Sequence, residues 1–317
     1  LSNEFPILVE KFIDNAIEID VDAISDGSNV HIMGILEHLE EAGIHSGDST
    51  MVYPTVNIKN DVLKKIIDDV KDLTLKSNIL GFVNYQLMVK NDEIIFIEAN
   101  PRASRTVPFI SKANNIPYAK LGTSLMLGKK LKDVDLKVNG RYYVKLSVFP
   151  FNRLKGADPV LGPEMKSTGE VMGIGKNFNE ALFKAFISVY KINKKSVLLS
   201  LNDDDKKKLD FLDYIKDWEI YATPGTYRCL KEKGLESKIV YKISDNREPN
   251  ILDIIRKNGI GIVINTPGKS YRSFGDGYYI RREAIDNNIP VITNIKLARN
   301  IFMSISEEYD LYPLKKS

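Results

Sequence analysis

The chain has 317 residues, of which 43% are hydrophobic and 27% are charged. At about 150 residues per domain this length indicates two domains, and the apolar content excludes a disordered chain. The formal net charge of +3 excludes the strongly basic surface of a general nucleic-acid or membrane-surface binder.

The single cysteine, Cys229, excludes an internal disulfide and a multi-cysteine metal cluster, as is typical of a reducing compartment. Apolar runs fall short of the ~18 to 20 residues that cross a bilayer, and the first residues lack the regions of a signal peptide. We therefore expect a cytoplasmic protein. Because the sequence begins with Leu1 and not Met, we also expect a piece of a longer protein.

The first part of the chain combines strands with one clear helix. Residues 18–24 alternate strictly between polar and apolar, which predicts a half-buried strand with three carboxylates on its polar face. A second strand is expected at 31–37. Apolar residues at helical spacing after Asp61, the expected N-cap, predict an amphipathic helix. Residues 82–90 and 94–100 are typical of an antiparallel hairpin, so this part is expected to be α+β.

The pattern changes after a predicted helix at 179–192, which places a domain boundary at 193–195 and two domains at 1–192 and 195–317. In the second domain short β-rich runs alternate with helical segments. Strands are expected at 196–201, 219–223, 238–243, 260–265 and 291–293, and helices at 204–216, 226–233, 251–258, 281–288 and from 296. This alternation predicts an α/β doubly wound domain with a parallel sheet covered on both faces.

The segment 97–106 carries residues suited to metal and phosphate chemistry. Residues two apart on a strand share a face, so the Glu98 carboxylate and the Asn100 amide oxygen are expected to point the same way. Hard oxygen donors suit Mg²⁺ or Mn²⁺ held partly by nucleotide phosphates. Arg102 and Arg105 follow with guanidinium groups for phosphoryl oxygens. The alternative is a polar strand end with two solvated arginines.

Gln86 on the partner strand tests this interpretation through the register of the hairpin. A two-residue turn would put Gln86 on the wrong face. A three-residue loop, 91–93, pairs Gln86 with Glu98 and Asn84 with Asn100, which brings four oxygen-bearing side chains together. We predict the three-residue loop.

The histidines His31, His38 and His45 recur every seven residues, which suits one face of a helix and a zinc site. Glycines and a β-rich run between them argue against a continuous helix, so zinc is not the favoured interpretation. His45 lies in a Gly-containing loop, 43–49, whose backbone could approach a ligand closely and whose His or Ser could bond a hydroxyl or phosphate. The alternative is an ordinary turn.

The carboxyl edge of the predicted parallel sheet carries another candidate site. The segment 223–226 joins a strand to a helix, where free N–H groups favour a small anion. Lys242 and the segment 265–268 lie at the same edge, where open α/β sheets bind ligands. The alternative is helix capping by Thr226.

Four segments, 18–23, 37–49, 98–109 and 161–173, resemble the large subunit of carbamoyl-phosphate synthase, and the resemblance covers essentially the whole chain. It implies the later part of the second ATP-grasp unit, followed by a methylglyoxal-synthase-like regulatory domain. Members of this family make carbamoyl phosphate from bicarbonate, two ATP and ammonia that a glutamine amidotransferase small subunit supplies. The second ATP-grasp unit phosphorylates carbamate.

The resemblance implies roles for individual positions. Those matching the metal ligands are Gln86, Glu98 and Asn100, and those matching the arginines beside the phosphates are Arg102 and Arg105. Those matching contacts to adenine, ribose and phosphate are Lys11, Ile13, Glu18, Gly43, Ile44, His45 and Ser46. Those matching the phosphate part of a nucleotide-effector site are Lys206, Thr223, Thr226, Lys242, Asn265 and Thr266.

Two departures from the family pattern bear on regulation. Leu146 stands where ornithine-activated members carry a second carboxylate, which argues against ornithine activation. Thr266-Pro267-Gly268 replaces Thr-Thr-Ser-Gly, so the identity of the effector stays open. The resemblance also implies that the lobe with the Gly-rich phosphate loop lies upstream. We therefore expect negligible ATP formation from carbamoyl phosphate and ADP by these residues alone.

Two other functions stay open, and a third is disfavoured. The chain could be a non-catalytic effector-binding module, or the first domain could belong to another ATP-grasp ligase. A true methylglyoxal synthase is disfavoured because His45 is the last histidine, and proton abstraction in that enzyme family involves histidine. Nucleic-acid and membrane partners are not expected. The pathway stays open between arginine and pyrimidine synthesis, and a homo-oligomer stays possible.

Overall fold

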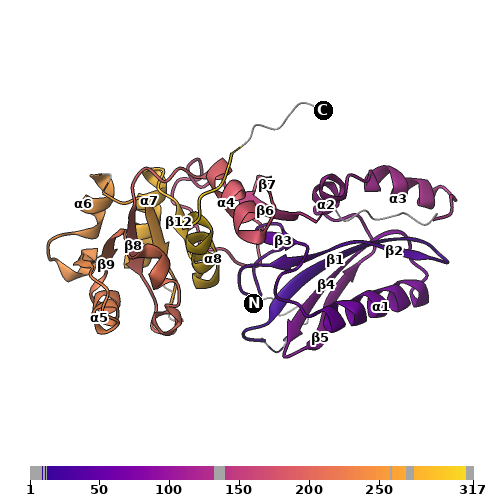
Figure 1. Ribbon diagram of the computed structural model, residues 1–317, viewed down its shortest axis with the longest axis horizontal. Helices are drawn as coiled ribbons and strands as arrows, with labels where there is room; N and C mark the ends of the chain where they lie inside the picture. Colours follow the sequence, from indigo (N-terminus) through magenta and orange to yellow (C-terminus); the bar gives the residue numbers. More distant parts are fainter. Residues whose placement is uncertain are drawn as a thin grey trace, which may run out of the picture.

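The computed structural model describes residues 9, 11, 13–131, 140–257, 259–268 and 275–311. They form a seven-stranded antiparallel sheet, in the order β5-β4-β1-β2-β3-β6-β7, and a five-stranded parallel sheet, in the order β10-β9-β8-β11-β12 (Figure 1). The expected succession of an α+β part and an α/β part is therefore confirmed. None of the helices in these ranges is both long and apolar enough to span a bilayer.

The elements of the first part are β1 (Ile17–Asp26), β2 (Val30–His38), β3 (Met51–Tyr53), α1 (Asn60–Lys76), β4 (Leu80–Lys90), β5 (Glu93–Asn100), α2 (Val107–Asn114), α3 (Tyr118–Met126), β6 (Tyr142–Val148), β7 (Gly169–Gly175) and α4 (Phe178–Val189). Those of the second are β8 (Ser196–Ser200), η1 (Asp205–Lys208), η2 (Leu212–Ile215), β9 (Glu219–Ala222), α5 (Pro224–Glu232), β10 (Lys238–Ile239), η3 (Ile243–Asp245), α6 (Ile251–Arg256), β11 (Ile262–Asn265), α7 (Asp276–Asp286), β12 (Val291–Ile292) and α8 (Ile295–Ile305).

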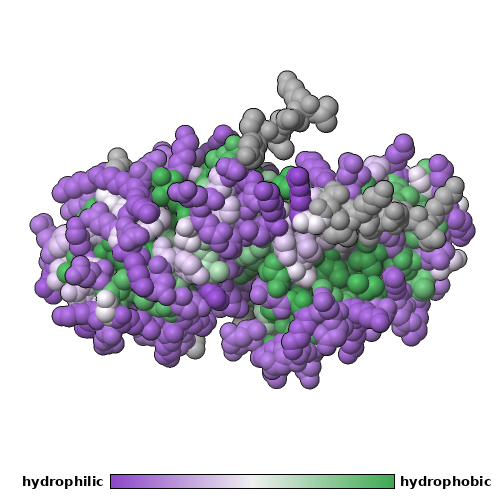
Figure 2. Space-filling model, in the orientation of Figure 1, coloured by the Kyte–Doolittle hydropathy of each residue, from purple (hydrophilic) through white to green (hydrophobic). Residues whose placement is uncertain are grey.

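Helices cover both faces of the seven-stranded sheet. Val62 and Ile66 of α1 join one core with Val21 of β1, whereas Ile110 of α2 joins another with Leu36 of β2 on the opposite face. Figure 2 shows hydrophobic residues gathered over this sheet, between α1 and the α2–α3 pair. The central strands are therefore buried from both sides.

This burial corrects the interpretation of 18–24 as a half-buried strand. Glu18, Asp20 and Asp22 lie on the face opposite α1, yet they are only 5%, 2% and 1% exposed. The alternation marked two different packing environments, one apolar and one polar. Strict alternation alone does not distinguish a polar layer under a loop from a solvated face.

One helix boundary and one whole helix also differ from expectation. Asp61 lies in the first turn of α1, and the N-cap position belongs to Lys59. The helix expected at 204–216 is replaced by η1 and η2. Leu209 and Phe211 are both buried, and residues two apart on an α-helix point about 200° apart, so one face of a continuous amphipathic helix could not bury both.

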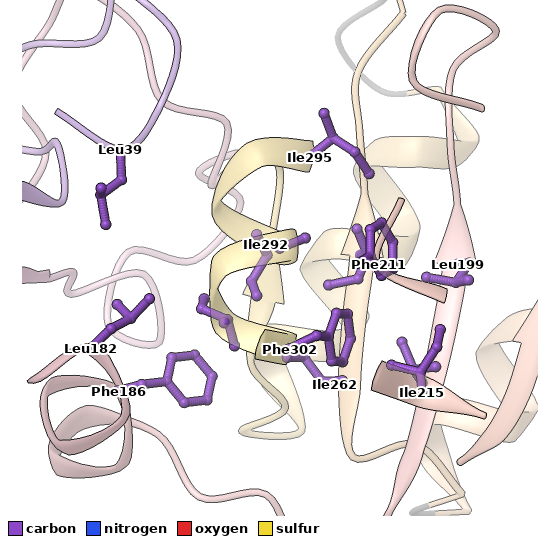
Figure 3. Close-up of a cluster of buried hydrophobic side chains, with 14 of the residues drawn as sticks. Leu39, Leu182, Phe186, Leu199, Phe211, Ile215, Ile262, Ile292, Ile295 and Phe302 are labelled. Carbon is purple, nitrogen blue, oxygen red and sulfur yellow. The ribbon is translucent and has the colours of Figure 1, made fainter. Parts of the chain in front are cut away.

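One hydrophobic core joins the two parts of the chain (Figure 3). It includes Leu182 and Phe186 of α4 from the first part, and Ile292 of β12 and Phe302 of α8 from the second. The core is continuous past 193–195, and the boundary placed there stays a prediction.

Candidate functional site

The β4–β5 hairpin has the predicted pairing but reaches it by another route. Gln86 pairs with Glu98 and Asn84 with Asn100. The three-residue loop is wrong, because the turn consists of two residues, Asn91 and Asp92, whose positive φ angles of 50° and 67° suit a tight hairpin. A β-bulge at Ile97, between Phe96 and Glu98, supplies the odd residue.

The pairing puts three side chains with possible metal-ligand oxygens on one face at the sheet edge. They are Gln86, Glu98 and Asn100, and we call this surface the donor face. The Asn100 amide Nδ2 donates to the Glu98 Oε1 over 2.7 Å, and the Gln86 Nε2 donates to the Ser46 Oγ over 3.2 Å. Each amide nitrogen is thus engaged, which leaves the amide oxygens as acceptors. In the described ranges no three His, Cys, Asp or Glu side chains are placed to hold a metal. One carboxylate and two amides fit Mg²⁺ or Mn²⁺ only if phosphates or water complete the shell.

The loop expected to contact the nucleotide lies over the polar face of the same sheet. The Gly43 N–H donates to the Glu18 Oε2 over 3.4 Å. The buried Lys145 donates its Nζ to the carbonyls of Ser46 at 3.0 Å and Gly47 at 3.3 Å. Burial lowers the pKa of Lys145. The loop is therefore anchored beside Gln86, and the structure brings Glu18, the loop and the donor face together.

Four other expected residues are less enclosed. Arg102 and Arg105 are exposed after β5, and the Arg102 Nη1 donates to the Ala103 carbonyl over 3.3 Å. Lys11 is exposed and Ile13 is half-buried in the segment before β1. The arginines lie at the strand end as expected, in the solvated state that the alternative interpretation describes.

The histidines do not share one helix. His31 and His38 lie on β2 and His45 lies in the loop, where its Nδ1 accepts from the Gly47 N–H over 3.0 Å. His38 is buried with its Nδ1 3.9 Å from Glu18 and its Nε2 3.6 Å from Asp20. Burial acts to lower the pKa of His38, but these two carboxylates outweigh it and the pKa is raised.

Asp22 has a buried carboxylate that the sequence interpretation did not single out. The Asp22 Oδ1 accepts from the Asn84 Nδ2 over 3.0 Å, and its Oδ2 accepts from the Thr106 hydroxyl. Burial raises the pKa of Asp22 to about 6. Asp22 of β1 thus connects Asn84 of β4 to the turn that carries Arg105. The sequence signal that could have identified Asp22 was its place in the alternating strand.

The carboxyl edge of the parallel sheet borders a cleft of about 1050 Å³. Four of the six expected effector residues line it: Lys206, Lys242, Asn265 and Thr266. The other two lie outside this lining set. Thr223 and Thr226 are buried, and the Thr226 hydroxyl accepts from the Leu201 N–H over 3.1 Å. Thr226 therefore connects the chain after β8 to α5, which contradicts the capping alternative, and its expected contact with an effector stays a prediction.

Arg281 is a cleft residue that the sequence interpretation missed. Its buried guanidinium donates to Asp158 from Nε at 2.8 Å and from Nη2 at 2.6 Å, and its Nη1 donates to the Asn265 Oδ1. The lining of the cleft also includes Gly43 and Ile44 of the first part. The cleft is therefore lined by residues of the parallel sheet and of the loop 43–49 of the first part.

Comparisons with known proteins agree with this arrangement. Residues 3–134 match the ATP-binding domain of the carbamoyl-phosphate synthase L chain, and residues 210–293 match the MGS-like domain. The carbamoyl phosphate synthase large chain, C-terminal section, of Methanocaldococcus jannaschii is 45% identical over 323 residues, which cover 94% of this chain and 51% of that protein. The same section of Aquifex aeolicus is 41% identical over 332 residues, covering 96% and 61%.

The large chain of Acidobacterium capsulatum is 46% identical over 312 residues, covering 94% of this chain and 28% of that protein. The chain thus spans about a quarter to three-fifths of the length of these relatives. Two domain matches in the same order as the two sheets, with identity along nearly the whole chain, show that the chain belongs to the carbamoyl phosphate synthase large-chain family.

Proposed function

We propose that the chain supplies the metal- and nucleotide-binding face of an ATP-grasp site that phosphorylates carbamate, and that its second domain binds a nucleotide effector. One observation carries the proposal, namely the strand register that puts Gln86, Glu98 and Asn100 on one face next to the loop 43–49. In the complete enzyme an amidotransferase subunit would supply the ammonia.

The proposed role of each residue follows from the chemistry of its side chain. Glu98, Asn100 and Gln86 would hold Mg²⁺ or Mn²⁺, which offsets charge on the nucleotide phosphates. Arg102 and Arg105, exposed at the strand end, are free to turn toward phosphoryl oxygens when substrate binds. The hydrogen bond from the Lys145 Nζ to the Ser46 carbonyl holds the loop in place and so would position the nucleotide.

Binding of Mn²⁺ with ADP tests the donor face in the chain itself. We expect Glu98→Gln to weaken Mn²⁺–ADP binding by about tenfold or more, because it removes the one charged donor. Glu93→Gln is the matched control, since Glu93 is also exposed on β5 but pairs with Lys90 at the turn. Titration followed by the electron paramagnetic resonance of free Mn²⁺ measures both. Equal binding by Glu98→Gln and the parent chain would reject the site.

Activity needs a complete site, so it is tested in a chimera. We expect this chain alone to form negligible ATP from carbamoyl phosphate and ADP. Replacing the matching segment of the Methanocaldococcus jannaschii section with this chain should give a protein that forms ATP. The same chimera with Glu98→Gln should lose that activity, and robust metal-dependent turnover by the chain alone would contradict the expectation.

The effector role has a separate test because the cleft of about 1050 Å³ lies at the other sheet. AMP and adenosine differ by the phosphate alone. We expect AMP to bind more tightly than adenosine, and Lys242→Gln to remove the difference, since Lys242 lines the cleft. Lys238→Gln on the exposed end of β10 is the control. Isothermal titration of the whole chain gives the four affinities.

A further inference from the structure

The loop between β6 and β7 covers residues 149–168, and we name it the β6–β7 loop. Connections longer than about 12–15 residues without a helix or strand of their own are uncommon in compact domains, and many of them are functional. Its first half contacts α7 of the second domain, and its second half contacts the loop 43–49 of the first. The conformation of the β6–β7 loop is therefore set from both sides.

Arg282 of α7 binds the first half of the β6–β7 loop through its backbone. Arg282 is 7% exposed, and its Nη2 donates to the Phe151 carbonyl over 2.9 Å. Its Nη1 donates to the carbonyls of Leu154 at 3.2 Å and Ala157 at 3.1 Å. Its Nε and Nη2 also donate to Asp286 at 3.1 Å and 2.6 Å, so the five N–H donors of the guanidinium are all engaged. Arg282 therefore holds the loop and does not serve a bound ligand.

Two further side chains of α7 extend the contact that Arg282 makes. The Tyr278 hydroxyl donates to the Gly156 carbonyl over 3.0 Å, and the Arg281 Nε and Nη2 donate to the Asp158 carboxylate. Hydrogen bonds from a charged guanidinium are stronger than those from a neutral donor. The helix α7 therefore fixes the first half of the β6–β7 loop at several points.

The second half of the β6–β7 loop binds the loop that is expected to contact the nucleotide. The His45 N–H donates to the Gly162 carbonyl over 2.9 Å. The Asp48 carboxylate accepts from the N–H groups of Lys166 and Ser167, both over 2.8 Å. Asp48 is 1% exposed, so these charge-assisted hydrogen bonds are shielded from water. Movement of the β6–β7 loop would therefore also move the segment that carries His45 and Asp48.

The loop 43–49 in turn contacts the donor face, because the Ser46 Oγ accepts from the Gln86 Nε2 over 3.2 Å. Hydrogen bonds and the intervening backbone thus connect α7 to a proposed metal ligand. We propose that Arg282 is a positioning residue for the nucleotide, because it fixes the β6–β7 loop and so holds the loop 43–49 beside the donor face. This inference rests on the proposed function of the donor face.

The change Arg282→Met keeps an apolar stem but removes every N–H donor of the side chain. The three loop carbonyls then lose their partner, and a smaller fraction of molecules holds the loop 43–49 in place. The apparent Kd for a nucleotide rises by the inverse of that fraction. If about one fifth of the molecules keep the loop in place, Mn²⁺–ADP should bind about fivefold more weakly.

Hydrogen exchange and Mn²⁺–ADP binding of the whole chain test the proposal. Mass spectrometry measures amide exchange in the peptide that contains 43–49 without nucleotide, and electron paramagnetic resonance of free Mn²⁺ measures binding. We expect Arg282→Met to speed exchange in this peptide about fivefold or more and to weaken Mn²⁺–ADP binding about fivefold. Arg282→Lys keeps the charge and three donors, so both changes should be smaller.

Leu230→Ala separates positioning from a general loss of stability. Leu230 is fully buried on α5, which packs on β9 and β10, so its truncation leaves a cavity away from the β6–β7 loop. Urea unfolding should show lower stability for this variant. Its exchange in 43–49 and its Mn²⁺–ADP binding should stay as in the parent chain.

Lys166→Met is a second way to loosen the β6–β7 loop. The Lys166 Nζ donates to the Val160 carbonyl over 2.6 Å within this loop, without involving α7. We expect Lys166→Met to change exchange and binding in the same direction as Arg282→Met. If Arg282→Met does not fold, as circular dichroism would show, Arg282→Lys and Lys166→Met decide.

Four results would overturn the proposal. Unchanged exchange of 43–49 in the folded Arg282 variants would mean that other contacts hold this loop. Faster exchange with unchanged Mn²⁺–ADP binding would mean that the position of the loop does not matter to the nucleotide. Equal changes in Leu230→Ala would mean that stability alone is responsible. Absence of Mn²⁺–ADP binding by the parent chain would reject the proposed function and this inference with it. Because exchange is measured without nucleotide, that failure is distinguishable from a failure of the positioning role.

Discussion

Asp22 offers a direct test of how the donor face is supported. Its carboxylate is 1% exposed and accepts from Asn84 and Thr106, and burial raises its pKa from 3.8 to about 6. A carboxyl whose pKa is higher in the folded state holds its proton more tightly there than in the unfolded chain. Ionisation at rising pH therefore lowers the free energy of unfolding.

The magnitude follows from the two pKa values. A rise from 3.8 to about 6 costs about 3 kcal/mol once both states are ionised. At about pH 4.5 only about 1 kcal/mol of this cost is present, because the folded state still holds its proton. Between about pH 4.5 and 7.5, Asp22 should therefore remove about 2 kcal/mol from the free energy of unfolding.

Urea unfolding of the parent chain and Asp22→Asn at these two pH values measures the effect. The asparagine does not titrate, so its altered hydrogen bonds contribute a similar offset at both values. We expect the free energy of the parent minus that of the variant to be about 2 kcal/mol lower at the higher pH. Asp68→Asn on the exposed face of α1 is the surface control. A difference that is constant, or larger at the higher pH, would refute the reasoning.

Two further predictions concern packing and the contact between the two parts. In Gly173→Ala the new Cβ would lie 1.9 Å from the Ala181 carbonyl oxygen, so we expect a loss of about 3 kcal/mol or a failure to fold. Gly169→Ala, on the same strand with nothing within 4 Å, should cost less than about 1 kcal/mol in the same urea assay. Arg281→Met removes the bidentate partner of Asp158, and thermal unfolding should show a loss of about 3 kcal/mol that Arg281→Lys partly restores.

The hairpin shows what local pattern could and could not predict. Alternation and turn residues predicted two antiparallel strands, and the chemistry of Glu98 and Gln86 predicted that they share a face. Both are confirmed. The loop length is wrong because a bulge can shift the register inside a strand, and an extra residue there leaves no compositional mark. The requirement that Gln86 and Glu98 share a face thus predicted the register better than the turn residues did.

Burial was the harder quantity to predict. The alternation of 18–24 is the same whether the polar residues face water or a loop that supplies donors. Glu18 meets the Gly43 N–H, and this contact joins residues 25 positions apart. A polar residue can be buried when such donors exist, but short-range pattern does not contain them. The prediction that Glu18, Asp20 and Asp22 lie on a solvent-exposed face is therefore wrong, because all three are buried.

Contacts between distant segments set the geometry of the cleft at the parallel sheet. Asn265 was expected there because it ends a parallel strand, and the structure places it in the cleft. Its amide oxygen is held by Arg281, whose other two donors reach Asp158, 123 residues earlier. The orientation of Asn265 in the second domain is thus tied to a loop of the first. A ligand that displaces the Asn265–Arg281 hydrogen bond would also disturb the Arg281–Asp158 pair, which joins the cleft to the first part of the chain.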